Sequence, residues 1–178
     1  MKNKAHSSFY LFLFIVISFN YGNEVFGQEK VNLSIGVGSP ELYNIGVRYQ
    51  LEQAQIGISY GIIPGYYNGR VFSISGDLYI HFGGNSKFSE RHPWYFRIGI
   101  SYLRDETSYT IHKYTYLPIR VGRDINFSKK IGMAIDLGVV IELNDKEIQK
   151  QPTSSFWSFL ENDTSILPGL GITLFYRL

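Results

Sequence analysis

Cysteine is absent from this chain of 178 residues, and charged residues make up only 18% of it. A disulfide scaffold, a thiolate metal site, a cysteine nucleophile and lipid attachment through an N-terminal cysteine are therefore excluded. The 17 Lys and Arg nearly balance the 15 Asp and Glu, so no basic excess indicates a nucleic-acid partner. Aromatic residues reach 16%, which argues against disorder, and the length fits one domain.

The N-terminal segment is typical of a secretory signal. Lys2 and Lys4 precede the apolar run FYLFLFIVISF of residues 9–19, and a small residue, Gly27, follows at a position that a signal peptidase can read. The run is shorter than the roughly 20 residues that a membrane-spanning helix requires. We interpret residues 1–27 as a signal peptide that is removed, and residues 28–178 as the mature domain.

Beyond residue 30 the chain lacks sustained helical spacing and alternates with a period of two, which is typical of strands. Turn signals separate eight such segments. They span residues 31–38, 43–52, 55–62, 71–82, 94–104, 114–123, 131–142 and 166–178. One phase of the alternation consists almost entirely of large apolar and aromatic residues, and the opposite phase is mostly Gly, Ser and Asn with a few Arg and Asp.

The phase with small and polar side chains indicates which face of the sheet is enclosed. A soluble sandwich would place Lys, Glu and Thr on the face that meets water. Here the side chains of the polar phase are mostly small, and its few fixed charges can pair across a closed interior. The predicted lumen charge network is Arg48, Asp77, Arg97, Arg120, Asp136 and Arg177, with Glu52 and Glu142 as further candidate partners.

Aromatic residues of the apolar phase gather at the segment ends. Two girdles of rings that flank an aliphatic band are typical of a barrel in a bilayer. If the first segment rises from the inner side, the outer girdle is Tyr43, Tyr60, Phe72 and Tyr102, and the inner girdle is Tyr49, Phe82, Trp94 and Tyr176.

The eight segments together predict an all-β fold, an eight-stranded antiparallel up-and-down transmembrane β-barrel. An even number of strands closes the barrel without the unpaired edges that lipid forbids, and leaves both termini on the periplasmic side. Segment 114–123 is expected to be irregular, because Tyr114 and Tyr116 fall out of phase and Pro118 cannot donate to the ladder.

The chain ends in an alternating aromatic strand, Leu174-Phe175-Tyr176-Arg177-Leu178. With the signal and the eight segments, this ending resembles the small eight-stranded outer-membrane β-barrel family of the OmpA and OmpX type, over nearly the whole mature chain. The sequence departs from the family at Leu178, where the assembly signal usually ends in Phe. The resemblance implies the outer membrane of a Gram-negative bacterium, with outer-membrane lipid and the barrel-assembly machinery as partners.

Catalytic and metal-binding patterns are lacking. The four histidines do not lie at metal-ligand spacing. Ser75, Asp77 and His81 share one face of one strand, but at about 3.3 Å per residue Ser75 and His81 are some 20 Å apart. We therefore expect no enzyme activity, no metal and no cofactor.

The last loop, residues 144–165, is the least expected feature. Phe156, Trp157, Phe159 and Leu160 lie together in it, and such loops commonly carry function. They form either a contact patch for another outer-membrane or surface protein or a cluster that packs on its own hairpin or at the lipid interface. Residues 63–70 and 105–112 are the other predicted outer loops.

Three alternatives remain open beside a structural or interaction role through these loops. A narrow pore for small solutes would need an open lumen, whereas eight strands enclose a space that side chains fill. A lipid-modifying barrel enzyme would need a hydroxyl and a histidine that meet across strands. A soluble lipocalin-like binder would turn the apolar phase inward, although the chain lacks the Gly-x-Trp motif that lipocalins share near their first strand.

Overall fold

The computed structural model describes residues 30–64, 69–149 and 165–178. It contains eight strands: β1 Val31–Gly38, β2 Leu42–Leu51, β3 Ala54–Ile62, β4 Gly69–Gly83, β5 Trp94–Thr107, β6 Thr110–Asn126, β7 Ile131–Gln149 and β8 Ile166–Arg177. Each strand pairs antiparallel with the next, and β8 pairs with β1 to close the barrel. The predicted all-β, eight-stranded up-and-down barrel is confirmed. No helix in the described ranges is long and apolar enough to cross a membrane.

The period-two alternation explains which side chains turn outward. In β3, Ile56, Ile58 and Tyr60 are exposed on the outer surface, whereas Gln55 faces the lumen and is buried. Directly paired residues of antiparallel strands share a face, so the register extends this division around the barrel. The interior is therefore polar and the outside apolar, the reverse of a soluble barrel.

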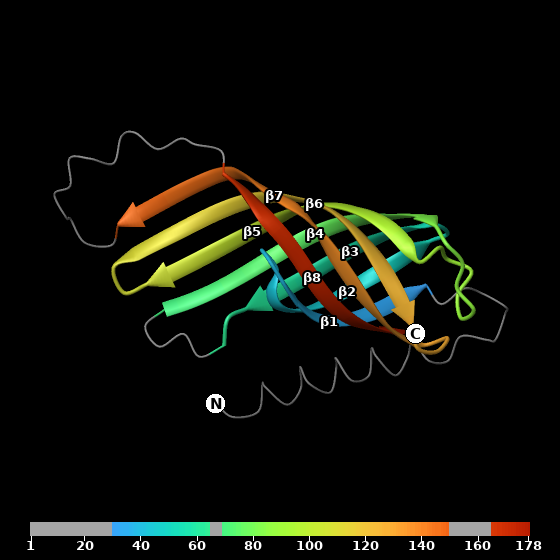
Figure 1. The fold of residues 1–178 in the computed structure, drawn as a ribbon. Coiled ribbons are helices and arrows are strands. Elements are labelled where there is room, and N and C mark those ends of the chain that lie inside the picture. The colour runs from blue at the N-terminus through green and yellow to red at the C-terminus, as the bar shows by residue number, and fades with distance from the viewer. Residues whose placement is uncertain (1–29, 65–68, 150–164) are drawn as a thin grey trace, which may run out of the picture.

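The barrel has two unequal ends. We call the end that carries the β1–β2, β3–β4, β5–β6 and β7–β8 connections the loop end, and the opposite end, where β1 begins and β8 finishes, the terminal end. Figure 1 shows β5, β6 and β7 projecting at the loop end well beyond the β1–β2 turn. The rim is therefore high on one side and low on the other.

The projecting strands correct the predicted loop boundaries. Residues 105–112 were expected to be a loop, but β5 continues to Thr107 and β6 begins at Thr110, so only a two-residue turn remains. Residues 144–149 likewise belong to β7. The alternation of apolar and polar residues fades in these extensions because both faces carry polar side chains, and the sequence pattern therefore ends too early.

The predicted irregularity of the sixth strand is confirmed. The register between β6 and β7 shifts between Thr115 and Tyr116, where Tyr116 pairs with Glu142 and Thr115 with Asn144. The shift leaves Leu143 without a direct partner on β6. On the other side, the pairing with β5 is interrupted near Pro118, which has no N–H to donate.

Candidate functional site

A network of buried charges fills the lumen at the level of Arg97. The guanidinium of Arg97 on β5 donates to both carboxylate oxygens of Asp77 on β4, from Nε at 2.9 Å and from Nη2 at 2.8 Å. The same guanidinium approaches Asp136 on β7 at 3.4 Å. A bidentate contact such as that between Arg97 and Asp77 fixes the geometry of both side chains.

Arg120 on the neighbouring strand β6, the register partner of Arg97, completes the network. Its Nη1 donates to Asp136 at 2.8 Å, and the side chains of both residues are 0% exposed. Tyr95 also donates its hydroxyl to Asp136 at 3.0 Å. Of the six predicted network residues, the structure thus brings together Asp77, Arg97, Arg120 and Asp136.

The turn between β1 and β2 supplies a carboxylate that sequence reasoning missed. Glu41 is buried and accepts hydrogen bonds from Arg97 at 2.8 Å and from Arg120 at 2.9 Å. Arg120 also donates to the carbonyl oxygen of Ser39. The short turn therefore folds into the lumen and closes it from the loop end. Glu52 and Glu142, the predicted further partners, form no ion pair with these arginines in the described structure.

Two residues on neighbouring strands hold the backbone of Glu41 in place. The hydroxyl of Ser73 donates to the Glu41 carbonyl at 2.9 Å. A Cβ atom at Gly61 would lie 1.8 Å from the same carbonyl oxygen, so only glycine leaves room for the turn. Neither residue is near Glu41 in the sequence, and no periodic signal could have shown that the turn folds inward.

Gly61→Ala is expected to displace the turn and lower the midpoint of urea unfolding. The clash is with backbone, which can yield only by moving Glu41 away from Arg97 and Arg120. We expect a loss of about 1–3 kcal/mol in the free energy of unfolding, the usual cost of overpacking. Gly76→Ala is the matched control, since a Cβ there meets nothing within 4 Å. Equal midpoints for the two variants would contradict this role of Gly61.

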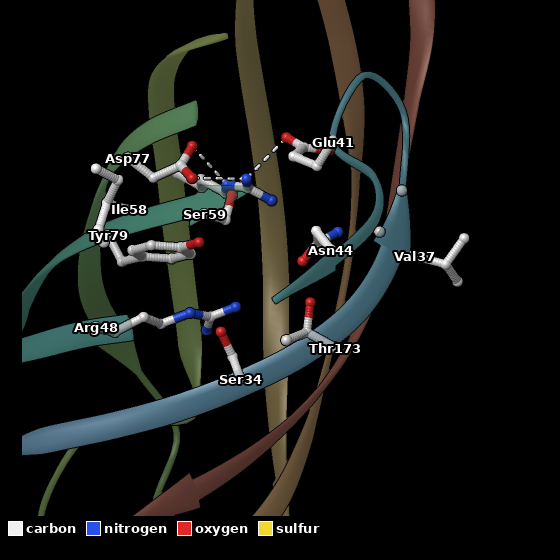
Figure 2. Close-up of a pocket in the computed structure, with 14 residues that line it drawn as sticks. Ser34, Val37, Glu41, Asn44, Arg48, Ile58, Ser59, Asp77, Tyr79 and Thr173 are labelled. Carbon is white, nitrogen blue, oxygen red and sulfur yellow. Dashed lines mark hydrogen bonds and ion pairs between the residues drawn. The ribbon is translucent and has the colours of Figure 1, made fainter. Parts of the chain in front are cut away.

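Arg48 and Arg177, the other two predicted members, lie outside the ion-paired cluster. Arg48 packs over the ring of Tyr79 at 4.4 Å and faces a cavity of about 20 Å³ lined by Ser34, Asn44 and Thr173, as Figure 2 shows. That volume is about that of one water molecule. Arg177 lies at the terminal end, where it donates to the carbonyl of Lys129 and to the Asn126 side chain.

A second buried ion pair closes the terminal end. Arg91, from the β4–β5 connection, is buried and donates to Asp124 and to Gln50. Beside it, Tyr79 and Tyr95 belong to a buried cluster with Ala134 and Phe175. Arg91 lies in a segment whose sequence reads as a turn, so its inward position was also not predicted. The lumen is thus occupied at both ends and in the middle.

The predicted girdle residues all belong to the outward-facing phase. Six of them are among the exposed large hydrophobic residues: Tyr43, Tyr49, Tyr60, Phe82, Trp94 and Tyr176. The remaining two are packed against their neighbours: Phe72 lies 6.2 Å from Tyr60 and 6.3 Å from Tyr102, measured between ring centroids. At the loop end, these three rings form one continuous aromatic surface.

The inner face of the projecting strands carries a stack of rings. His112, Tyr114 and Tyr116 of β6 stack with centroid separations of 6.0 and 5.8 Å. Asp105 pairs with His112 in register, and Asp145 with Tyr114. This face is therefore aromatic and acidic, and it rises above the Glu41 turn.

Ser75 and His81 are buried on the lumen side, and both form hydrogen bonds with neighbouring residues. Ser75 accepts a hydrogen bond from Ser101 at 2.7 Å, and His81 contacts the carbonyl of His92 at 2.7 Å. Across the described ranges, no group of His, Asp or Glu side chains could hold a metal ion. The predicted contact patch of Phe156, Trp157, Phe159 and Leu160 lies outside the described residues, as does the predicted signal peptide of residues 1–27.

Comparison with known proteins returned no match to this chain among family models, curated proteins or solved structures.

Proposed function

We propose that the protein is an integral β-barrel of the outer membrane of a Gram-negative bacterium, similar in kind to the OmpA and OmpX barrels. It has a structural and interaction role at the cell surface. Outer-membrane lipid surrounds its wall, the assembly machinery inserts it through its last strand, and both termini lie in the periplasm. The loop end, with its high rim, faces outward from the cell.

The single observation that carries this proposal is the exposed apolar wall. Ile58 is 62% exposed, Leu137 66% and Ile35 60%, and they lie on strands spread around the barrel. A soluble monomer rarely exposes an apolar patch larger than a few hundred Å². A wall of this kind, together with a network of buried charges in the lumen, matches a hydrocarbon solvent outside and a polar interior.

The height of the wall supports the same proposal. Along β4, Phe72 and Phe82 face outward ten residues apart. At about 3.3 Å per residue and a tilt of about 40°, that separation spans about 25 Å across the membrane. A barrel of the outer-membrane type has an apolar band of about the same height.

The occupied lumen supports a structural or interaction role more than conduction. Glu41 and Arg91 fold in from opposite ends. Arg97 pairs with Glu41, Asp77 and Asp136, and Arg120 pairs with Glu41 and Asp136. A pore would require these side chains to separate, which exposes unpaired buried charges. A contact role instead uses the aromatic and acidic inner face of the projecting strands, which rises above the Glu41 turn.

Electrophoresis in SDS, with and without boiling, tests the proposal on protein from a washed outer-membrane fraction. We expect the unboiled protein to migrate differently from the boiled protein, because a closed barrel with a buried ionic core resists the detergent. Planar bilayers that contain the folded protein should show no steady single-channel openings. Absence of the protein from the membrane fraction, with no boiling-dependent shift, would overturn the proposal.

A further inference from the structure

Three basic residues lie side by side across the projecting strands. In register, Arg104 of β5 pairs with Lys113 of β6, and Lys113 pairs with Lys146 of β7. Directly paired residues of antiparallel strands point to the same face, so the three cations form one row. We call Arg104, Lys113 and Lys146 the basic row.

The basic row faces the outside of the barrel at the level of the loop-end aromatic surface. Arg104 also pairs with Phe72 of β4, whose ring faces outward between Tyr60 and Tyr102. Tyr102 lies in the next outward-facing position of β5, one step closer to the terminal end. In the proposed membrane orientation, the row therefore lies at the depth of the lipid headgroups.

Nothing within the described structure neutralises most of this charge. Arg104 forms an ion pair with Glu106 at 2.7 Å, while Lys113 and Lys146 form no ion pair in the described ranges. Arg70 lies opposite Glu106 on the same face, so this face carries four cations and one carboxylate. Like charges placed directly opposite each other destabilise a sheet, so the arrangement favours an anion that lies across the row.

A groove adjoins the basic row. It has a volume of about 510 Å³, and Tyr60, Ile62 and Phe72 line it together with Arg70, Arg104 and the carboxylate of Glu106. The Nε atom of Arg104 is buried and has no hydrogen-bond partner among the described residues. Because the groove contains two arginines and one carboxylate and borders Lys113 and Lys146, its charge is positive overall, and with its apolar floor it suits a molecule that carries both hydrocarbon and negative charge.

We propose that the basic row and this groove bind a phosphorylated lipid of the outer leaflet, with phosphate on Arg104, Lys113 and Lys146 and apolar atoms against Tyr60 and Phe72. The proposal rests on the proposed function, because only a membrane-embedded barrel places the row at headgroup depth. Arginine and lysine both bind phosphate, arginine through two donors and lysine as a point charge. Asp105 and Asp145 lie on the opposite face, and Glu106, the carboxylate on the face of the row, pairs with Arg104 and leaves the charge of Lys113 and Lys146 for the phosphate.

The test measures binding of diphosphoryl lipid A to the folded, full-length barrel in phosphatidylcholine bilayers. The variant R104Q/K113Q/K146Q removes the row, and K87Q/K129Q/K130Q removes three exposed lysines from the terminal-end turns as the matched control. Each cation near an anionic lipid surface contributes on the order of fivefold, so the row variant is expected to bind about 100-fold more weakly. The control should bind as the parent does, and salt should weaken parental binding.

A second set of measurements keeps the proposal open to refutation. Lys146→Glu alone, at an exposed position, should also weaken binding, and dephosphorylated lipid A should bind equally weakly to parent and row variant. Equal affinity of the row and control variants for diphosphoryl lipid A would overturn the proposal. Competition by inorganic phosphate at the same concentration would overturn the assignment to a lipid.

The boiling-dependent shift in SDS separates this proposal from the proposed function. Every variant is first checked for the shift and for insertion into the bilayer. If the parent and both variants insert and shift, but the row and control variants bind diphosphoryl lipid A equally well, only the lipid site fails. If the parent neither inserts nor shifts, the membrane assignment itself fails.

Discussion

Ile58→Arg is expected to destabilise the barrel in a bilayer by about 2–4 kcal/mol, the cost of arginine on the lipid face near the membrane midplane. Ile58 faces outward and pairs with Val47 and Gly76, about midway between the two ends of the apolar wall. Equilibrium unfolding in lipid vesicles, followed by Trp fluorescence, measures the change. Water around the same position would tolerate the charge, since the side chain is already 62% exposed.

Ile62→Arg is the matched control for depth. Ile62 lies on the same strand and face but pairs with Tyr43 and Phe72 at the loop-end aromatic surface. Arginine near the interface costs about 0–1 kcal/mol. If both variants unfold at the parental denaturant concentration, the outward face does not meet hydrocarbon.

Asp136→Ala is expected to lower the free energy of unfolding by about 3 kcal/mol, at the lower end of the cost of breaking a buried ion pair. The substitution removes the acceptor for Arg120 at 2.8 Å and for Tyr95 at 3.0 Å. Arg120 and Arg97 each keep Glu41, which limits the loss. Urea unfolding of the parent and the variant, under identical lipid conditions, gives the difference.

Asp145→Asn provides the control for Asp136, because Asp145 is an exposed carboxylate on the same strand. Surface substitutions of this kind usually change stability by less than about 0.5 kcal/mol. A double-mutant cycle with Arg120→Met then isolates the coupling between Arg120 and Asp136. If the free energy of unfolding falls no more for Asp136→Ala than for Asp145→Asn, the lumen network does not stabilise the fold.

The barrel could be predicted because alternation assigns each strand residue to a face without knowledge of its partners. Asp77, Arg97, Arg120 and Asp136 all fall in the polar phase, and the closed sheet brings their four strands to one lumen. Arg177 falls in the same phase but is the last residue of β8, at the terminal end of the barrel. Its depth depends on how the strands are staggered, which the alternation does not encode.

The residues that sequence reasoning missed lie where alternation stops. Glu41 and Arg91 belong to connections, and each reaches the lumen only because the backbone around it folds inward. The position of Glu41 depends on Gly61 and Ser73, which lie 20 and 32 residues further along the chain. Such non-local contacts leave no trace in the local pattern.

The projecting strands were missed for a different reason. Above the aromatic surface both faces of β5 to β7 carry polar side chains, with Arg104 and Lys113 on one face and Asp105 and His112 on the other. A sheet with two polar faces has no apolar period to detect. The same residues that conceal these strands in the sequence form the basic row and the acidic, aromatic inner face.

The central claim is that the apolar wall lies in hydrocarbon, and a spin-label depth measurement tests it most directly. Because the chain contains no cysteine, a single cysteine introduced at Ile58, Ile100 or Leu137 takes up one nitroxide at that position alone. In the folded protein reconstituted with lipid, we expect these labels to collide more with oxygen than with a water-soluble nickel chelate, and a label at Lys129 to show the opposite. Preferential collision of all four labels with the nickel chelate would contradict the membrane assignment.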